Sequence, residues 1–350
     1  MAISTRRNNQ VTERTGSTLT VNVGPLTAPH PGRYCRSVAP TARPFRFGIQ
    51  ASRAADARGW ADDARRIEDF GYDTLTMPDH FTDQLAPVPA LMAAADATER
   101  LRVGALVFDN DYKHPVVLAK ELATMDVLSG GRVEIGIGAG WMASDYEASG
   151  ISYDRPGVRI DRFEEGVAVI KGAMAEGPFS FVGQHYTISD YDGQPLPLQR
   201  PHPPILIGGG GRRVLSIAAR EADIVGVNGT MTAGVVGPDA LGTMTLDAVT
   251  ERVGWVREAA GDRIDDIELN IRVFFVSITE DPDSVIEGVA SMFGVDPAMV
   301  EQSPFALVGS INSVTEDLVR RREQLGFSYI IVGPDDVDSF APVVAALTGR

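Results

Sequence analysis

The sequence predicts an α/β protein with the fold of a (β/α)8 TIM barrel. Strand-like apolar segments alternate with segments of helical spacing about eight times along the chain, which is the pattern of parallel βα units. No spacer rich in Ser, Pro or Gly divides the 350-residue chain after position 44, so we predict a single barrel domain over 44–350. Two long irregular segments, 142–156 and 228–242, follow the fourth and sixth predicted strands, where such a barrel carries its substrate loops. A doubly wound open sheet is the competing arrangement.

The first 43 residues are predicted to be a flexible N-terminal arm. They contain Thr, Arg, Asn and Pro without sustained helical or strand periodicity, and such a terminus is typically disordered unless a partner subunit orders it. Their apolar stretch is too short and polar for a secretory signal. The single Cys35 cannot form an intramolecular disulfide, so nothing indicates an oxidising compartment, and we expect a cytoplasmic protein.

The first half of the barrel is predicted from short apolar strands, each followed by an amphipathic helix. Trp60, Ala64 and Ile67 recur at helical spacing before Gly71, a residue common just after a helix end. Pro115 stands at the favoured first position of a helix. In chain order, the predicted elements are strand 45–50, helix 60–70, strand 73–77, helix 88–98, strand 101–108, helix 116–128, a strand within 130–141 and helix 158–174.

The second half repeats this alternation after a hairpin. The hairpin is predicted over 179–188, with its turn at Gly183 and Gln184. In chain order, the remaining predicted elements are strand 203–207, a helix ending near 220, strand 223–227, helix 246–260, strand 268–278, helix 318–325, strand 329–332 and helix 337–347.

Composition excludes several classes of function. The formal net charge of −15 argues against a nucleic-acid partner, because phosphate binding requires a basic surface. No apolar run approaches the roughly 20 residues of a membrane span. The five histidines show no paired spacing typical of metal ligands, and the carboxylates read as helix surface, so no metal site is predicted.

Asp79 and His80 follow the second predicted strand. The carboxyl ends of barrel strands build the active site, and a histidine there can donate or accept a proton near neutral pH. The alternative is a polar cap of the barrel rim. We predict His80 and Asp79 as the catalytic residues.

Two neighbouring strand ends offer a surface for a planar ring. Asn110, after the third strand, can both donate and accept hydrogen bonds at the edge of a heterocycle. Gly138 and Gly140, at the end of the fourth strand, leave room for a ring to lie on the backbone, and Trp141 can wall the pocket or pack in the core. His114 precedes Pro115 and is expected to cap the following helix.

Four glycines, Gly208, Gly209, Gly210 and Gly211, follow the fifth strand at the start of a helix. Free backbone N–H groups and the helix dipole bind anions there, so we predict a phosphate site rather than a merely flexible turn. Arg212, next in the chain, adds a charge-assisted contact unless it is an ordinary solvated residue. A flat ring, a phosphate and a histidine together suggest a flavin-like cofactor.

Taken jointly and in order, these motifs make residues 45–227 resemble the luciferase-like flavin and deazaflavin oxidoreductases, the bacterial luciferase superfamily. The matching segments are Phe45-Arg46-Phe47-Gly48, Gly71-Tyr72-Asp73, Pro78-Asp79-His80, Asn110-Asp111-Tyr112-Lys113-His114-Pro115, Leu128-Ser129-Gly130-Gly131-Arg132, Gly136-Ile137-Gly138-Ala139-Gly140-Trp141 and 203–211. After residue 230 the match is architectural only. The Gly-Ala-Gly-Trp turn, the Asp-His pair and the tetraglycine most resemble the actinobacterial subgroup that uses coenzyme F420.

The resemblance implies a (β/α)8 barrel that commonly dimerises, so a homodimer is expected. It also implies a cis peptide at Leu106–Val107 against the face of the ring. His80 would then lie over the ring with Asp79 beside it, the glycines at 138 and 140 would contact the ring, and the amides of residues 209–211 would take the cofactor phosphate. Arg212, Arg213 and Lys113 are candidates for the anionic tail of F420.

The resulting hypothesis is an F420-dependent oxidoreductase that moves a hydride between the deazaflavin and a small organic substrate at a C=C, C=N or C=O group. Sugar-phosphate dehydrogenases of this family have a glutamate where this chain has Trp141, which argues against sugar oxidation. The alternative is a monooxygenase that uses reduced FMN. A non-catalytic ligand-binding barrel is the third reading, although it would need only the glycines and not His80.

Overall fold

The computed structural model describes residues 43–230 and 241–350, all within one compact unit. The predicted arm lies outside the described residues except for its last position, as does most of the predicted 228–242 segment.

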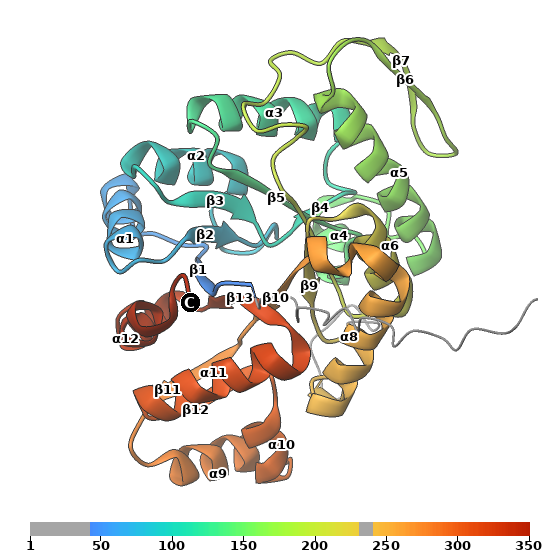
Figure 1. The fold of residues 1–350 in the computed structure, drawn as a ribbon. Helices are drawn as coiled ribbons and strands as arrows, with labels where there is room; N and C mark the ends of the chain where they lie inside the picture. The colour runs from blue at the N-terminus through green and yellow to red at the C-terminus, as the bar shows by residue number, and fades with distance from the viewer. Residues whose placement is uncertain (1–42, 231–240) are drawn as a thin grey trace, which may run out of the picture. The chain divides into compact units, whose positions relative to one another are not determined.

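Parallel strands close into a barrel whose connecting helices lie on the outside (Figure 1). The third strand position is filled by two short strands, because β3 pairs with both β2 and β5 while β4 pairs with β5. The (β/α)8 TIM-barrel prediction is therefore confirmed. The barrel strands are β1 (Arg46–Gln50), β2 (Thr74–Met77), β3 (Arg102–Ala105), β4 (Phe108–Asp109), β5 (Val133–Gly138), β8 (Ile205–Gly209), β9 (Ile224–Val227), β10 (Glu268–Arg272) and β13 (Phe327–Val332).

The helices begin and end at residues suited to those places. Asp56 caps the first helix by accepting a hydrogen bond from the Gly59 amide at 2.8 Å. His114 caps α3 through its ring nitrogen, 3.3 Å from the Val116 amide, so its structural interpretation is confirmed. The helices are α1 (Ala57–Asp69), α2 (Pro87–Ala97), α3 (Pro115–Leu128), α4 (Ala143–Ser149), α5 (Pro156–Met174), α6 (Arg212–Glu221), α8 (Leu246–Ala260), α9 (Pro282–Phe293), α10 (Pro297–Gln302), α11 (Ile311–Leu325) and α12 (Val337–Leu347), with 3-10 turns η1 (Gly261–Asp266) and η2 (Pro334–Asp336).

Two predicted strands are interrupted. The predicted strand 101–108 breaks between β3 and β4, where the Leu106–Val107 peptide is cis, as expected from the resemblance. The predicted strand 268–278 also breaks, because the chain exchanges hydrogen-bond partners: the Val273 amide donates to Ile331, but the Phe274 amide donates to Phe305. The second half, β11 (Phe275–Ile278), pairs with β12 (Ala306–Gly309) in a separate two-stranded sheet.

Two further predictions need correction, and one agrees with the structure. The 142–156 segment is not irregular throughout, because it contains α4, which ends at Gly150 with φ of 75°. Helix α11 begins at 311 rather than 318, since Ser310 accepts from the Ser313 amide and caps it. The hairpin of β6 (Phe179–Val182) and β7 (Thr187–Tyr191) agrees closely with its predicted place.

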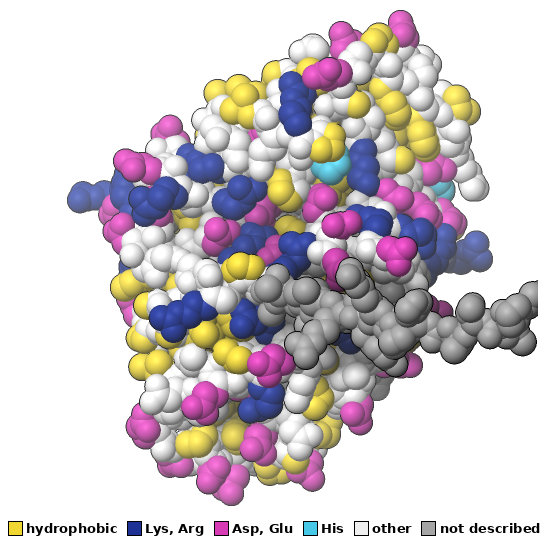
Figure 2. Space-filling view, viewed as in Figure 1, with side chains coloured by type: hydrophobic (Ala, Val, Ile, Leu, Met, Phe, Trp, Pro, Cys, Tyr) yellow, Lys and Arg dark blue, Asp and Glu magenta, His cyan; other side chains and the backbone are white. Residues whose placement is uncertain are grey.

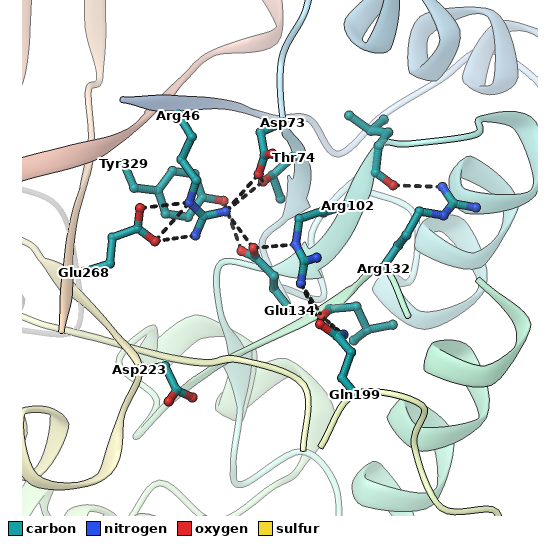
Figure 3. Close-up of polar contacts among 12 residues, drawn as sticks. Arg46, Asp73, Thr74, Arg102, Arg132, Glu134, Gln199, Asp223, Glu268 and Tyr329 are labelled. Carbon is teal, nitrogen blue, oxygen red and sulfur yellow. Dashed lines mark hydrogen bonds and ion pairs between the residues drawn. The ribbon is translucent and has the colours of Figure 1, made fainter. Parts of the chain in front are cut away.

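The base of the barrel interior carries charged side chains (Figure 3). Arg46 on β1 forms ion pairs with Glu134 on β5 at 2.6 Å and with Glu268 on β10 at 2.7 Å. Arg102 reaches Glu134 at 2.8 Å, and the Arg46 guanidinium lies 3.6 Å from the centre of the Tyr329 ring. Contacts among three strands that are not neighbours in the sheet place these side chains inside the barrel. The prediction that carboxylates lie on helix surfaces is wrong for Glu134 and Glu268.

Because side chains alternate between the two faces of a strand, every second residue toward the carboxyl end of each strand also faces the barrel interior. The middle layer holds four glycines, one on each of β1, β3, β5 and β9: Gly48, Gly104, Gly136 and Gly226. TIM-barrel interiors are usually filled by branched side chains, and here Leu206, Ile224 and Ile331 cluster with Tyr329. The glycines allow close packing, because a Cβ at Gly104 or Gly136 would overlap a neighbouring backbone carbonyl. We call the inward-facing positions nearest the carboxyl ends of the strands the upper layer. It includes Gln50 on β1, Gly138 on β5 and Arg272 on β10.

Figure 2 shows acidic and basic side chains interspersed over one face of the described residues. The whole sequence has a formal net charge of −15. None of the helices that the structure describes is long and apolar enough to cross a membrane.

Candidate active site

The carboxyl ends of the barrel strands meet at one mouth, where active sites of this fold lie. Asp79 and His80 follow β2, residues 138–141 end and follow β5, and the tetraglycine ends β8 and opens α6. The topology therefore brings the main predicted segments to the same end of the barrel.

His80 is held by a buried carboxylate. Its Nδ1 lies 2.6 Å from Oδ2 of Asp145, and 21% of the His80 side chain is exposed against 3% for Asp145. A carboxylate only accepts hydrogen bonds, so Nδ1 carries the hydrogen and Nε2 is left as the nitrogen that can exchange a proton. The His80 ring also packs against Trp141 in a T-shaped arrangement, with ring centres 5.7 Å apart and planes at 88°.

Helix α4 delivers Asp145 to this position. Asp145 lies in the first turn of α4 and is buried. Its carboxylate also accepts from the hydroxyl of Tyr112 at 3.2 Å and from the Phe81 amide at 3.4 Å. Three elements, the β2 exit, the β4 exit and α4, therefore converge on one carboxylate.

A second buried carboxylate, Asp109, ends β4. Its oxygens accept from the Tyr146 hydroxyl at 2.9 Å and from the Asp111 amide at 2.9 Å, and its own amide donates to Asp79 at 3.2 Å. Burial raises the pKa of Asp109 to about 7, and the negative charges of Asp111 and Asp79 act in the same direction. Burial also raises the pKa of Asp79. Two carboxyl groups at this mouth therefore favour their protonated forms more than ordinary aspartates do.

The glycines after β5 are required by close packing. A Cβ at Gly138 would lie 2.7 Å from Cγ2 of Val107, and at Gly140, where φ is 72°, it would overlap the Tyr146 hydroxyl. Asp109 and Tyr146 can therefore approach the chain only because residue 140 has no side chain. The predicted contact of these glycines with a ring stays a prediction.

Asn110 is directed away from the other predicted site residues. It is buried, its Nδ2 donates to Tyr186 at 3.2 Å, and a Cβ on Gly166 of α5 would overlap its Oδ1. That Oδ1 has no hydrogen-bond partner among the described residues. The side chain thus faces α5 and the hairpin, whereas the prediction gave it the edge of a heterocycle.

The tetraglycine loop has the features of a phosphate cradle. Gly211 is the N-cap residue of α6 and provides no side-chain cap, so it leaves the first amides of the helix without an acceptor from the N-cap position. A Cβ at Gly211 would meet no atom of the described residues within 4 Å. Buried Arg252 donates to the Gly210 carbonyl at 2.8 Å and adds positive charge behind the loop. These residues fit a phosphate group.

The cations predicted for the anionic tail are paired with carboxylates. Arg212 donates to Glu258 at 2.8 Å, Arg213 pairs with Asp161, and Lys113 reaches Glu121 at 2.6 Å. Each would have to exchange its partner to bind an anionic tail. No group of three or more His, Cys, Asp or Glu side chains in the described ranges is placed to hold a metal ion.

The model of one protein family, the luciferase-like monooxygenases, matches residues 41–303. The chain belongs to this family. The family assignment made from the sequence motifs is therefore confirmed.

Luciferase-like relatives with two different cofactors resemble the chain. The FMNH(2)-dependent dimethylsulfone monooxygenase of Pseudomonas putida is 32% identical over 199 residues, which cover 54% of each chain. The chain thus spans about half the length of that curated relative. The F420-dependent glucose-6-phosphate dehydrogenase of Kineococcus radiotolerans is 30% identical over 257 residues, covering 70% of this chain and 72% of the relative.

A solved structure shares the fold of this chain. The coenzyme F420 dependent tetrahydromethanopterin reductase from Methanopyrus kandleri superposes with a TM-score of 0.70 at 19% identity, over 87% of this chain and 98% of that one. The relatives of this chain thus include both an F420-dependent dehydrogenase and an FMNH(2)-dependent monooxygenase.

The sequence missed several residues of this luciferase-like site, chiefly Asp145, Asp109, Tyr112 and Tyr146. Asp145 lies in a short helix within a segment that has no readable motif, and its partner His80 is 65 residues away. A single signal was available: Asp109, Asp111 and Tyr112 stand directly after a predicted strand. Reading that strand end as a cluster of carboxylates would have identified Asp109.

Proposed function

We propose that the protein is an F420-dependent oxidoreductase, which transfers a hydride between the deazaflavin and a C=C, C=N or C=O group of a small organic substrate. The observation that carries this proposal is the His80–Asp145 pair at the barrel mouth, with Nε2 of His80 free to exchange a proton. Hydride transfer to such a group needs a matching proton, and a histidine of fixed tautomer can supply or remove it.

The longer of the two relative alignments supports F420. The F420-dependent dehydrogenase aligns over 70% of this chain, whereas the FMNH(2)-dependent monooxygenase aligns over 54%. We expect the amides of residues 209–211 to hold the cofactor phosphate and the turn at 138–141 to face its ring. When bound, the deazaflavin supplies a hydride carrier that lacks the ring nitrogen through which flavins react readily with oxygen.

The chain's own residues provide the proton chemistry and the walls. Asp145 holds His80 in one tautomer and orients its ring. Trp141 packs against that ring and limits its movement. The substitution of Trp141 for the glutamate of sugar-phosphate dehydrogenases leaves His80 as the proton donor or acceptor we assign.

A reduced-FMN monooxygenase is the second candidate. It is favoured by the 32% identity to the dimethylsulfone monooxygenase, and the phosphate cradle serves FMN equally well.

Binding titrations of the purified apoprotein with F420 and, separately, with FMN test the proposal through ring fluorescence. We expect tighter binding of F420, retained in His80→Ala, with hydride transfer to candidate acceptors lost in that variant. His202→Ala is the matched control, because His202 contacts the Pro203 carbonyl ahead of β8, at the opposite end of the barrel. Preference for FMN would move the protein to the monooxygenase branch, and binding of neither cofactor would contradict both candidates.

A further inference from the structure

Arg272 is a cation in the upper layer of the barrel interior. It is the last residue of β10, two and four positions beyond Asn270 and Glu268, and Glu268 is fixed inside the barrel by its ion pair with Arg46. Alternation therefore points Arg272 inward at the mouth. A Cβ at Gly333 would lie 3.4 Å from Nη2 of Arg272, so the glycine that follows β13 leaves the space through which the guanidinium passes.

Hydrogen bonds fix this guanidinium without neutralising it. Its Nε donates to Oε1 of Gln50 at 3.0 Å and its Nη1 donates to the Val273 carbonyl. Gln50 in turn donates through Nε2 to the Leu106 carbonyl at 2.9 Å. The oxygen and the nitrogen of the Gln50 side-chain amide therefore each have a hydrogen-bond partner. Together these bonds form a chain across the mouth from β10 through β1 to the exit of β3.

Arg272 differs from the arginines of the barrel base in having no ion pair within 4.0 Å among the described residues, although Oδ2 of Asp336 would lie 3.1 Å from the same Gly333 Cβ position. Arg46 and Arg102 both contact Glu134, at 2.6 and 2.8 Å. Within the described ranges no carboxylate lies within 4.0 Å of Arg272, although the charge of Asp336 acts on it from farther away. Burial lowers the pKa of Arg272 to about 10, whereas that of Arg46 is raised well above the ordinary arginine value by Glu134 despite its burial. The Asp336 charge and the Phe274 ring, whose centre is 5.4 Å from the guanidinium carbon, offset this burial only in part, and a desolvated cation without a close ion pair is costly to fold.

We propose that Arg272 binds an anionic group of a ligand in the floor of the barrel mouth, and that Gln50 orients it. Its Nη2 makes no hydrogen bond with any described residue and is the donor available to that group. The anion is either a carboxylate or other oxyanion of the substrate or the delocalised negative charge of the reduced cofactor ring. This proposal rests on the proposed function, because it assumes a hydride-transfer site at this mouth. Simple anions can nevertheless test the role of Arg272 without any cofactor.

The matched variants are Arg272→Gln, Arg272→Lys and Arg263→Gln. Arg263 is also partly buried and donates to two backbone carbonyls, those of Ala219 and Ala222, but it precedes β10 at the opposite end of the strand. The first measurement is the thermal midpoint in chloride, acetate and sulfate at equal ionic strength. The second is fluorescence titration with oxidised and with chemically reduced F420.

We expect acetate and sulfate to raise the midpoint of the wild type and of Arg263→Gln, and to do so much less in Arg272→Gln, if the anion is a substrate oxyanion. If the anion is the reduced ring, Arg272→Gln instead weakens binding of reduced F420 by about tenfold or more relative to oxidised F420. Arg272→Lys should keep part of either response, because it retains the charge. In chloride, Arg272→Gln should unfold at the wild-type midpoint or above it, since it removes an unpaired charge, whereas Arg263→Gln should unfold earlier.

Equal anion responses and equal binding of both redox states in wild type and Arg272→Gln would overturn the proposal, as would a lower chloride midpoint that marks Arg272 as structural. If the wild type binds no F420, the proposed function fails while the acetate and sulfate comparison still decides the role of Arg272.

Discussion

At the residue scale, the carboxylate of Asp145 decides which nitrogen of His80 can exchange a proton. Asp145→Asn replaces an acceptor with an amide that can donate toward Nδ1 and so disturbs the tautomer. We expect the turnover number to fall by about 100-fold or more, with the dissociation constant of the cofactor unchanged in fluorescence titration.

Tyr112→Phe provides the comparison for this variant. It removes the hydroxyl that donates to Asp145 at 3.2 Å but keeps the carboxylate. Its loss of turnover should stay well below that of Asp145→Asn, because the carboxylate that holds Nδ1 of His80 is retained and only one hydrogen bond to it, worth roughly 1.5–3 kcal/mol, is removed. Equal losses in the two variants would mean that the local packing, and not the carboxylate, supports His80.

Asp109 predicts a pH dependence of stability. Burial raises its pKa to about 7, against about 3.9 in an unfolded chain. Between these values the folded state keeps a proton that the unfolded state releases, so the free energy of unfolding falls as the pH rises, by up to about 1.4 kcal/mol per pH unit. The stabilisation is complete below about pH 4 and lost above about pH 7.

Asp109→Asn removes this titration. The thermal midpoint of the wild type minus that of Asp109→Asn should therefore decrease from pH 5 to pH 8. Thermal unfolding at unit pH intervals measures it, and a difference that is constant over this range would show that Asp109 does not hold the proton in the folded state.

At the scale of elements, a substitution at the start of α6 should affect the stability of the helix and the binding of phosphate in different directions. An aspartate at the N-cap position stabilises a helix because its carboxylate accepts hydrogen bonds from the first backbone amides of that helix. At residue 211 the same carboxylate would take the place of a bound phosphate and repel its negative charge. Gly211→Asp should thus unfold no earlier than the wild type but lose most of its affinity for F420. The deazaflavin riboside without phosphate should bind both proteins alike.

Gly211→Asn is the neutral control, because asparagine caps a helix comparably but carries no charge. It should bind F420 distinctly better than Gly211→Asp. Identical losses of F420 in the two variants would point to crowding rather than charge repulsion, and unchanged binding in Gly211→Asp would remove the phosphate from this loop.

Elements with local signals could be predicted from the sequence, and those set by distant partners could not. The helix capped by His114 is encoded by neighbouring residues and was predicted within one residue. The break after Arg272 depends on Phe305, whose carbonyl accepts from the Phe274 amide, and no local pattern shows that exchange. The same holds for the site, because the partner of His80 comes from a helix whose sequence carries no motif.

At the scale of the whole molecule, the barrel interior changes character from base to mouth. The base is filled by paired charges around Glu134, and the middle layer is largely glycine on β1, β3, β5 and β9. Above these layers, Gln50 and Arg272 add hydrogen-bonded polar groups beside the branched side chain of Ile331, the register partner of Arg272. Stability is then concentrated at the base and ligand recognition at the mouth.

The base network predicts a large loss of stability in Glu134→Gln. This substitution leaves the guanidiniums of Arg46 and Arg102 without the carboxylate they share, and breaking a buried ion pair costs roughly 3–5 kcal/mol. Urea denaturation should show a lower midpoint with an unchanged slope. Glu258→Gln is the control, because it removes only the exposed pair with Arg212, with side chains 68% and 61% exposed, and should change stability by no more than about 0.5 kcal/mol.

The pH dependence of the same comparison identifies the charge as the cause. Burial alone would raise the pKa of Glu134, but the positive charges of Arg46 and Arg102 outweigh burial and lower it. The stabilisation is therefore present above the unfolded pKa of about 4.3 and is lost as the pH falls through the lower folded value. The gap between wild type and Glu134→Gln should narrow only below about pH 4. A small gap at neutral pH would mean that Asp73 and Glu268, which also pair with Arg46 at 2.9 and 2.7 Å, suffice to hold the base closed.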